Sequence, residues 1–261
     1  MATRLALTYR IKSDAHRPPT INSARLQLLA GSVSTSCGYA DSAVVPFGVL
    51  YRGRGLHCAL QRLSQSWRLS DREVIFLRAS EAQRRRLSDY VRMEAKRLSI
   101  EGGNAQLREL RSEAFDVMMC LDAVGVDPIV FPIGENAPRL PTVTVDQQSG
   151  KRIGLHIDTW EGLTEDERKS ARARTCLNLG PGYRWFLFSD LAMSQMRVGG
   201  SDDVICDAKH LYETFLLRRT YLLRLAPGEG YIARTDTLVH DASTLWESKP
   251  SYFLHVLSYL Q

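Results

Sequence analysis

The sequence lacks the features that are typical of secreted proteins, of proteins with a structural metal site and of membrane-spanning proteins. Its five cysteines are an odd number and include no Cys-x-x-Cys pair, so neither a disulfide framework nor a structural zinc site is indicated. No run of about 18 apolar residues occurs, and the N-terminus lacks an apolar stretch followed by a small-residue cleavage site. From these absences we expect a cytoplasmic protein without a membrane span.

The excess of one sign of charge over the other is also small. The 34 Lys+Arg and 29 Asp+Glu residues leave a net charge of +5 that is spread along the 261 residues. This excess supports an anionic partner only weakly, and no motif that combines aromatic and basic residues indicates nucleic-acid binding. A small-molecule substrate is therefore favoured over nucleic acid as the partner. The oligomeric state is not indicated.

The first half of the chain is predicted to be mainly helical. Residues 5–11 and 43–51 have strand-like patterns, but between about 55 and 122 apolar residues recur at helical spacing, most clearly over 107–121. We therefore expect residues 1–130 to form a mainly helical flanking region that packs outside one sheet.

The second half reads as short strands separated by turns. Strand-like runs occupy 141–146, 152–160, 173–179, 183–188, 221–225, 231–239 and 251–260, and a helix is expected near 210–218 within an insertion. About seven or eight such strands suit an antiparallel sandwich or jelly roll. We expect an α+β protein, a single domain over 1–261, with a jelly-roll, cupin-like core at 131–261.

His156 and Asp158 are the residues on which the functional prediction depends. Residues i and i+2 of a strand point to the same face, so this imidazole and this carboxylate could hold one metal ion. The candidate for a third ligand is His240, in a strand-like run far downstream. Two His and one carboxylate form the facial triad of non-haem Fe(II) oxygenases, which leaves coordination positions open. For His255, a packing role in the last strand is preferred.

Together with Lys249 and Ser251, these residues resemble the Fe(II)/2-oxoglutarate-dependent dioxygenase superfamily. Its pattern is His-x-Asp/Glu, a distal His and a basic residue about ten positions later, often as Arg-x-Ser. The resemblance covers roughly residues 136–261 and implies a double-stranded β-helix. It places the His-x-Asp pair at the end of the second core strand, the distal His near the seventh, and the cosubstrate's far carboxylate on the eighth.

The resemblance also implies the chemistry. Fe(II) would be held by His156, Asp158 and His240, and would be chelated by 2-oxoglutarate as cosubstrate. Reaction with O2 would give succinate and carbon dioxide and would attack a C–H bond of the substrate. With a carboxylate at position 158 we expect hydroxylation, desaturation or ring chemistry and not halogenation. An amino acid or a natural-product intermediate is the favoured substrate.

The residue that binds the far carboxylate of 2-oxoglutarate is left open. Lys249 stands where the family usually has Arg, and a lysine pairs with a carboxylate as a point charge without the bidentate fork. Arg184, at the start of a predicted strand, is the second choice. Ser251 is expected to assist, and Asn178 is a candidate for a hydrogen bond to the cosubstrate or to a water.

Other side chains are candidates for the pocket and for support of the ligands. The substrate-binding candidates are Trp160, Arg172, Arg174 and Trp246, with packing or surface placement as the alternative. The two arginines are also further candidates for the cosubstrate carboxylate. Asp236 and Asp241 could accept the second N–H of His240, because ligating imidazoles usually donate it to such a group.

Two other functions stay open at this point. The first is an oxygenase that acts on a macromolecule, either a nucleobase or a protein side chain. The second is a cupin-like metal-binding protein that does not use 2-oxoglutarate, which the lysine at position 249 leaves possible.

Overall fold

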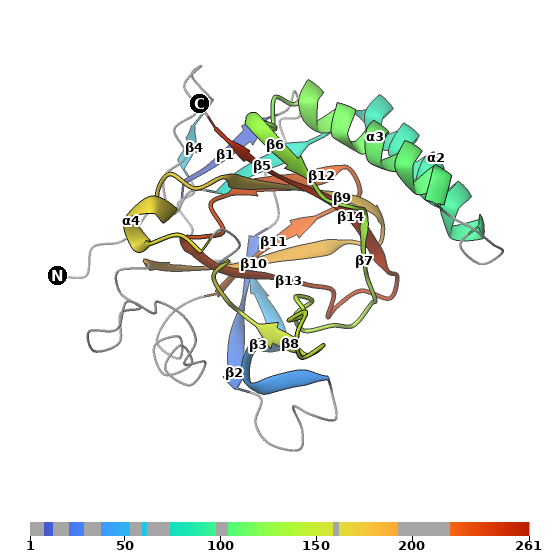
Figure 1. The fold of residues 1–261 in the computed structure, drawn as a ribbon. Helices are drawn as coiled ribbons and strands as arrows, with labels where there is room; N and C mark the ends of the chain where they lie inside the picture. The colour runs from blue at the N-terminus through green and yellow to red at the C-terminus, as the bar shows by residue number, and fades with distance from the viewer. Residues whose placement is uncertain are drawn as a thin grey trace.

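The computed structural model describes residues 8–12, 21–28, 38–52, 59–61, 74–97, 104–158, 162–192 and 220–260. Two sheets face each other, with a pair of helices on one side (Figure 1). The larger sheet has the order β4 (Ala59–Gln61), β1 (Thr8–Lys12), β5 (Val74–Arg78), β12 (Glu229–Ala233), β9 (Ala173–Pro181), β14 (Ser251–Tyr259) and β6 (Val126–Val130), and β7 (Gly134–Asn136) also pairs with β14.

The smaller sheet has the order β13 (Leu238–Ser243), β10 (Arg184–Ala192), β11 (Thr220–Leu225), β2 (Ile21–Leu28), β3 (Tyr39–Arg52) and β8 (Arg152–Gly154). An isolated antiparallel bridge between His156 and His240 connects the segment after β8 to β13. Since β8 and β13 are the two ends of this strand order, the bridge draws the ends of the smaller sheet together. The architecture is a β-sandwich of the jelly-roll type.

The space between the sheets is filled by an aromatic-rich core. Phe76 and Tyr231 come from the larger sheet, whereas Phe186, Phe188 and Tyr221 come from the smaller one. The rings of Phe186 and Tyr231 stack with their centroids 3.7 Å apart, which joins the two sheets directly. Strand side chains alternate between faces, so every second residue of these strands points into this layer.

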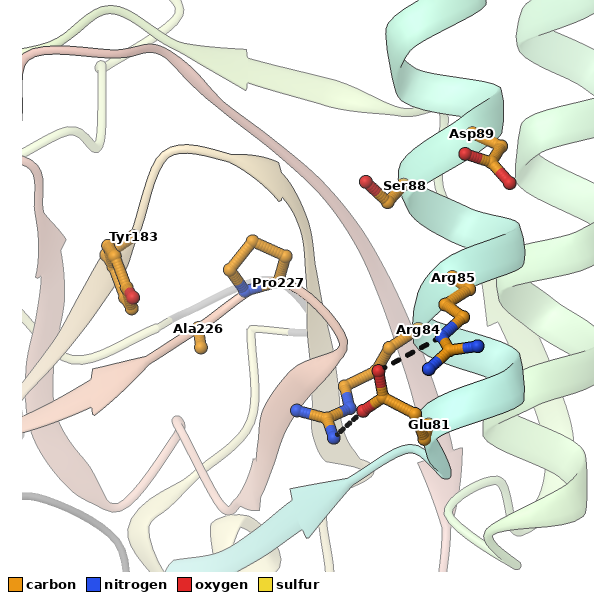
Figure 2. A pocket seen from close by; sticks show the side chains of 8 residues that line it. All are labelled: Glu81, Arg84, Arg85, Ser88, Asp89, Tyr183, Ala226 and Pro227. Carbon is orange, nitrogen blue, oxygen red and sulfur yellow. Dashed lines mark hydrogen bonds and ion pairs between the residues drawn. The ribbon is translucent and has the colours of Figure 1, made fainter.

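Helices α2 (Glu81–Arg97) and α3 (Asn104–Cys120) lie beside the larger sheet (Figure 1). Between α2 and the turn that joins β11 to β12 there is a pocket of about 580 Å³ (Figure 2). On its helical wall Glu81 forms ion pairs with Arg84 and Arg85. The lining residues are Glu81, Arg84, Arg85, Ser88, Asp89, Tyr183, Ala226 and Pro227. None of the predicted metal ligands is among them.

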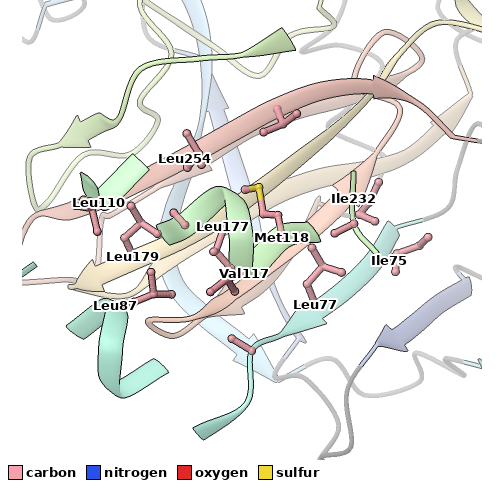
Figure 3. Packing of buried hydrophobic residues seen from close by; sticks show 14 of the residues in the cluster. Ile75, Leu77, Leu87, Leu110, Val117, Met118, Leu177, Leu179, Ile232 and Leu254 are labelled. Atoms are coloured by element: carbon pink, nitrogen blue, oxygen red, sulfur yellow. The ribbon is translucent and has the colours of Figure 1, made fainter. Parts of the chain in front are cut away.

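The two helices cover the outer face of the larger sheet through a second apolar core (Figure 3). On α3, Leu110, Ala114, Val117 and Met118 are fully buried, and their spacing of four, three and one residues places them on one helical face. On the sheet, the outward-facing apolar residues meet them, as Figure 3 shows for Leu177 of β9. A short helix, α4 (Glu165–Arg168), lies between β8 and β9 in the chain.

The prediction that residues 1–130 are mainly helical is wrong. The described part of this region contains strands β1 to β6 as well as α2 and α3. The misreading is clearest at β5, where all five residues, Val74–Arg78, are buried because the strand pairs with β1 on one side and with β12 on the other. A short continuous apolar run of this kind cannot be told from a buried helix by periodicity alone.

The strands of the second half lie close to their predicted positions. The runs at 173–179, 183–188, 221–225 and 251–260 correspond to β9, β10, β11 and β14. The run at 231–239 is divided into β12 and β13, and the run at 141–146 forms only an isolated bridge at Val145. The helix expected near 210–218 falls outside the described residues. Among the residues that are described, no helix is long and apolar enough to cross a membrane.

Candidate metal centre

Three side chains from two separate segments converge between the sheets. The candidate ligand atoms of His156, Asp158 and His240 all lie within 4.8 Å of one another, and the three residues are buried. Asp158 Oδ1 is 3.5 Å from His156 Nε2, and Asp158 Oδ2 is 3.6 Å from His240 Nε2. The two histidines exchange both backbone hydrogen bonds of their bridge, at 3.0 and 2.8 Å. The backbone therefore fixes the ligands relative to one another.

Both imidazoles are oriented by a carbonyl two residues earlier in the chain. Nδ1 of His156 lies 2.8 Å from the carbonyl oxygen of Gly154, and Nδ1 of His240 lies 2.9 Å from that of Leu238. A carbonyl can only accept, so in each ring Nδ1 carries the hydrogen and Nε2 presents its lone pair. Both Nε2 atoms therefore face the shared centre, from which each can bind a metal ion when it is unprotonated.

Gly154 is required by the way the chain enters this site. Its φ is +78°, and a Cβ there would lie 2.5 Å from the carbonyl oxygen of Val44 on β3. The same carbonyl accepts a hydrogen bond from the N–H of Leu155. Only glycine allows this approach without strain, which in turn places the carbonyl of Gly154 beneath the ring of His156.

The electrostatic surroundings keep Asp158 and His240 in their metal-binding forms. Burial would raise the pKa of Asp158, but Arg174, His240 and His156 outweigh it and hold this pKa well below its usual range. Burial lowers the pKa of His240 to about 3, so its ring is neutral at pH 7. For His156, burial is opposed by a hydrogen bond with Asp158 and by the charge of Asp241, and the pKa is raised.

Two arginines tie this site to the rest of the fold. Nη2 of Arg174, on β9, lies 2.6 Å from Oδ2 of Asp158. Nη1 of Arg168, on α4, donates to the carbonyl oxygens of Asp158 and Asp236 at 2.9 and 3.3 Å. Sequence reasoning missed Arg168, because it sits in a polar stretch without any signal that it would be buried.

The expected acceptor for His240 is different from the prediction. The ring of His240 donates to the carbonyl of Leu238, and Asp241 instead faces His156, with Oδ2 3.9 Å from its Nδ1. Oδ1 of Asp241 accepts from Thr144 Oγ1 at 2.8 Å. Asp241 points away from His240 because adjacent residues of a strand face opposite sides.

A second group of polar atoms lies further along the interior. Arg184, at the start of β10, is buried with its guanidinium 4.0 Å above the ring of Phe253. Within the described structure, its Nε and Nη1, Ser251 Oγ and both ring nitrogens of His255 have no hydrogen-bond partner. Burial, Arg174 and Arg184 lower the pKa of His255 to about 3. This part of the interior therefore offers a guanidinium stacked on Phe253 and several polar atoms without a hydrogen-bond partner among the described residues.

Lys249 and Asn178 are placed differently from the sequence expectation. Lys249 is exposed in the loop before β14. The side-chain amide of Asn178 donates to the carbonyls of Gly182 and Leu225 at 3.0 and 2.9 Å, and its oxygen accepts from Gly180 N–H at 3.1 Å. Asn178 thus holds the turn between β9 and β10, which corrects its predicted contact with the cosubstrate.

The predicted substrate contacts are also separated by the fold. Arg172 forms an ion pair with the exposed Asp127 and lies 4.4 Å over the ring of Tyr259, so it faces the edge of the larger sheet and not the metal centre. Trp246 is half-buried and packs edge-on against Trp185, with ring centroids 5.5 Å apart. Trp160 lies outside the described residues.

No family model matches this chain, and no curated protein sequence matches it. Solved structures of the Kdo hydroxylase KdoO, named as a non-heme Fe(II) alphaketoglutarate dependent dioxygenase, do match. Its apo structure is 10% identical over 72% of this chain and 79% of that chain, with a TM-score of 0.36. The complex with alphaketoglutarate and Fe(III) is 10% identical over 74% and 81%, with a TM-score of 0.37.

Because these identities and TM-scores are low, we derive the function from the residues of the site itself. The described residues include a His-Asp-His cluster inside a β-sandwich whose ligand atoms could hold one metal ion.

Proposed function

We propose that this protein is a non-haem Fe(II)/2-oxoglutarate-dependent oxygenase that hydroxylates, or desaturates, a small molecule such as an amino acid or a natural-product intermediate. The observation that carries the proposal is the convergence of His156 Nε2, His240 Nε2 and the Asp158 carboxylate in a buried site. Both imidazoles are held through Nδ1, so the set is oriented by the backbone before a metal binds.

The donor set fits Fe(II). Two imidazole nitrogens and one carboxylate oxygen are the ligands of non-haem iron oxygenases, whereas structural zinc sites usually have four protein ligands. When bound, Fe(II) supplies the activation of O2 that is coupled to oxidative decarboxylation of 2-oxoglutarate. His156, Asp158 and His240 would hold the metal, and the aromatic core, in which the ring of Phe186 lies 6.0 Å from that of His240, shields this site from bulk water.

For the far carboxylate of 2-oxoglutarate we propose Arg184, with Ser251, in place of Lys249. A buried cation is costly unless an anion compensates it, and Arg184 Nε and Nη1 have no hydrogen-bond partner among the described residues. Ser251 Oγ is buried and in the same condition. Lys249 is exposed, so water already solvates its charge.

The spacing along β10 supports this choice. Phe188 pairs with His240, and Arg184 lies four residues earlier on the same strand face. That separation is about 13 Å along the strand. An arginine side chain and a short dicarboxylate together span a separation of this order.

The proposal is tested by adding Fe(II) and 2-oxoglutarate to the purified protein without oxygen. A metal-to-ligand charge-transfer band in the visible spectrum is expected, and it should vanish in His156→Ala and in His240→Ala. His255→Phe, which keeps the three ligands, should retain it as the matched control. A normal band in His156→Ala would mean that the metal assignment is wrong.

The substrate class is tested by succinate release in air. Amino acids and biosynthetic intermediates are added one at a time, and the compound that raises succinate release and is itself oxidised is the substrate. Metal binding without any effect of 2-oxoglutarate would instead identify a cupin-like metal-binding protein.

A further inference from the structure

We propose that Arg174 is a positioning residue that makes Asp158 bind the metal through one oxygen only. Its guanidinium would hold Oδ2, which leaves Oδ1 for the metal and keeps the remaining coordination positions open for the cosubstrate and oxygen. This inference rests on the proposed metal centre and adds to it a device that sets the number of open positions.

The contacts around Asp158 divide its two oxygens between different partners. Oδ2 lies 2.6 Å from Nη2 of Arg174 in a buried ion pair, and 3.6 Å from His240 Nε2. Oδ1 lies 3.5 Å from His156 Nε2 and is the oxygen outside the ion pair with Arg174. A metal that binds both Nε2 atoms and Oδ1 would leave the ion pair with Arg174 in place.

The setting makes this ion pair strong and geometrically defined. The side chains of Arg174 and Asp158 are 14% and 4% exposed, so water screens the pair little. Arg174 sits on β9, where it pairs with Ala233 of β12 and with Leu257 of β14. The backbone of an arginine in the middle of a sheet is fixed in position, and its planar guanidinium loses little conformational freedom when it binds a carboxylate.

The consequence concerns how many positions the protein takes at the metal. Carboxylates bind metal ions through one oxygen or through both. A bidentate Asp158 would take one further position, and 2-oxoglutarate needs two and oxygen one. Arg174 prevents bidentate binding by competing with the metal ion for Oδ2. This competition gives the buried guanidinium a role beside a metal ion that would otherwise repel it.

The test counts water ligands on Mn(II), used as a probe of the site in the whole protein, by pulsed EPR in water enriched in oxygen-17. We expect about three waters in the wild type, because three of the six usual positions belong to the protein. Arg174→Met should show about two, since Oδ2 becomes free to bind. Arg174→Lys, which keeps a cationic donor, should stay at about three.

Arg172→Met is the matched control, because it removes an arginine two residues earlier that pairs with Asp127 and not with Asp158. It should keep about three waters. Arg174→Gln replaces Arg174→Met if the latter does not fold, because its shorter amide cannot reach Oδ2, and about two waters are expected again. A wild-type water count in Arg174→Met or Arg174→Gln would overturn this inference alone, whereas failure of the wild type to bind Mn(II) at His156 and His240 would overturn the proposed metal centre and this inference with it.

Discussion

Replacement of Arg184 by methionine is expected to weaken 2-oxoglutarate binding while leaving the metal site intact. Methionine has a similar length and fills the space over Phe253, so the loss is confined to the charge and its donors. A charge-assisted hydrogen bond contributes roughly 1.5–3 kcal/mol, which corresponds to a dissociation constant about 10- to 150-fold higher. Lys249→Met removes an exposed charge and should change the constant by about twofold or less.

The same substitution is expected to have the opposite effect on the stability of the protein without ligands. Arg184 Nε and Nη1 are buried without a hydrogen-bond partner in the described structure, so their desolvation opposes folding. Arg184→Met should therefore leave the free energy of unfolding unchanged or raise it by on the order of 1 kcal/mol. A purely structural arginine would give the reverse.

The assay is an anaerobic titration of the Fe(II) protein with 2-oxoglutarate, followed through the charge-transfer band, beside urea unfolding of each metal-free variant. Arg184→Lys is the control for charge, and it should bind more tightly than Arg184→Met but less tightly than the wild type, because lysine lacks the bidentate fork. If Lys249→Met weakened binding and Arg184→Met did not, the assignment of the cosubstrate anchor would be refuted.

Three further predictions follow from single contacts. Gly154→Ala should lower the free energy of unfolding by about 1–3 kcal/mol and weaken Mn(II) binding, because a Cβ at φ +78° meets the carbonyl of Val44. An unchanged Mn(II) affinity would contradict the role given to this glycine. Asn178→Ala should destabilise the protein by about 1–3 kcal/mol in urea unfolding, since the carbonyls of Gly182 and Leu225 lose their donor, with 2-oxoglutarate affinity unchanged. A selective loss of affinity would restore its predicted cosubstrate role. The pKa of His255 falls from 6.5 to about 3 on folding, so as the pH falls the unfolded chain takes up this proton first, and the protein loses stability below about pH 6.5, by on the order of 2 kcal/mol at pH 5. His255→Phe should lack this part of the pH dependence of the free energy of unfolding. An identical pH dependence in this variant would show that the ring is not buried in its neutral form.

The strands of the second half could be predicted because their signals are local. Alternation and the turn at Gly180, Pro181 and Gly182 mark β9 and β10, and these boundaries are close to those of the structure. The first half could not be predicted in the same way. At β5 the run Val74–Arg78 is buried on both faces, which removes the alternation that distinguishes a strand, and its partners β1 and β12 are distant in the chain.

For the site, the sequence by itself determined which residue types share a strand face. The period of two puts His156 and Asp158 on one side of an extended segment wherever that segment lies. His240 was predicted as the third ligand from a strand-like run far downstream, and the tertiary structure shows what brings it there, namely a backbone bridge that joins the ends of the smaller sheet.

Only the tertiary structure decided which of the basic residues face the metal centre. Arg172 and Arg174 have the same candidate roles from the sequence. Arg172 nevertheless pairs with Asp127 at the edge of the larger sheet, whereas Arg174 pairs with Asp158 between the sheets. Lys249 has the family spacing but is exposed, whereas Arg184 is buried. The residue type determines the chemistry of a side chain, but its burial and its partners depend on strands that pair across long distances in the chain.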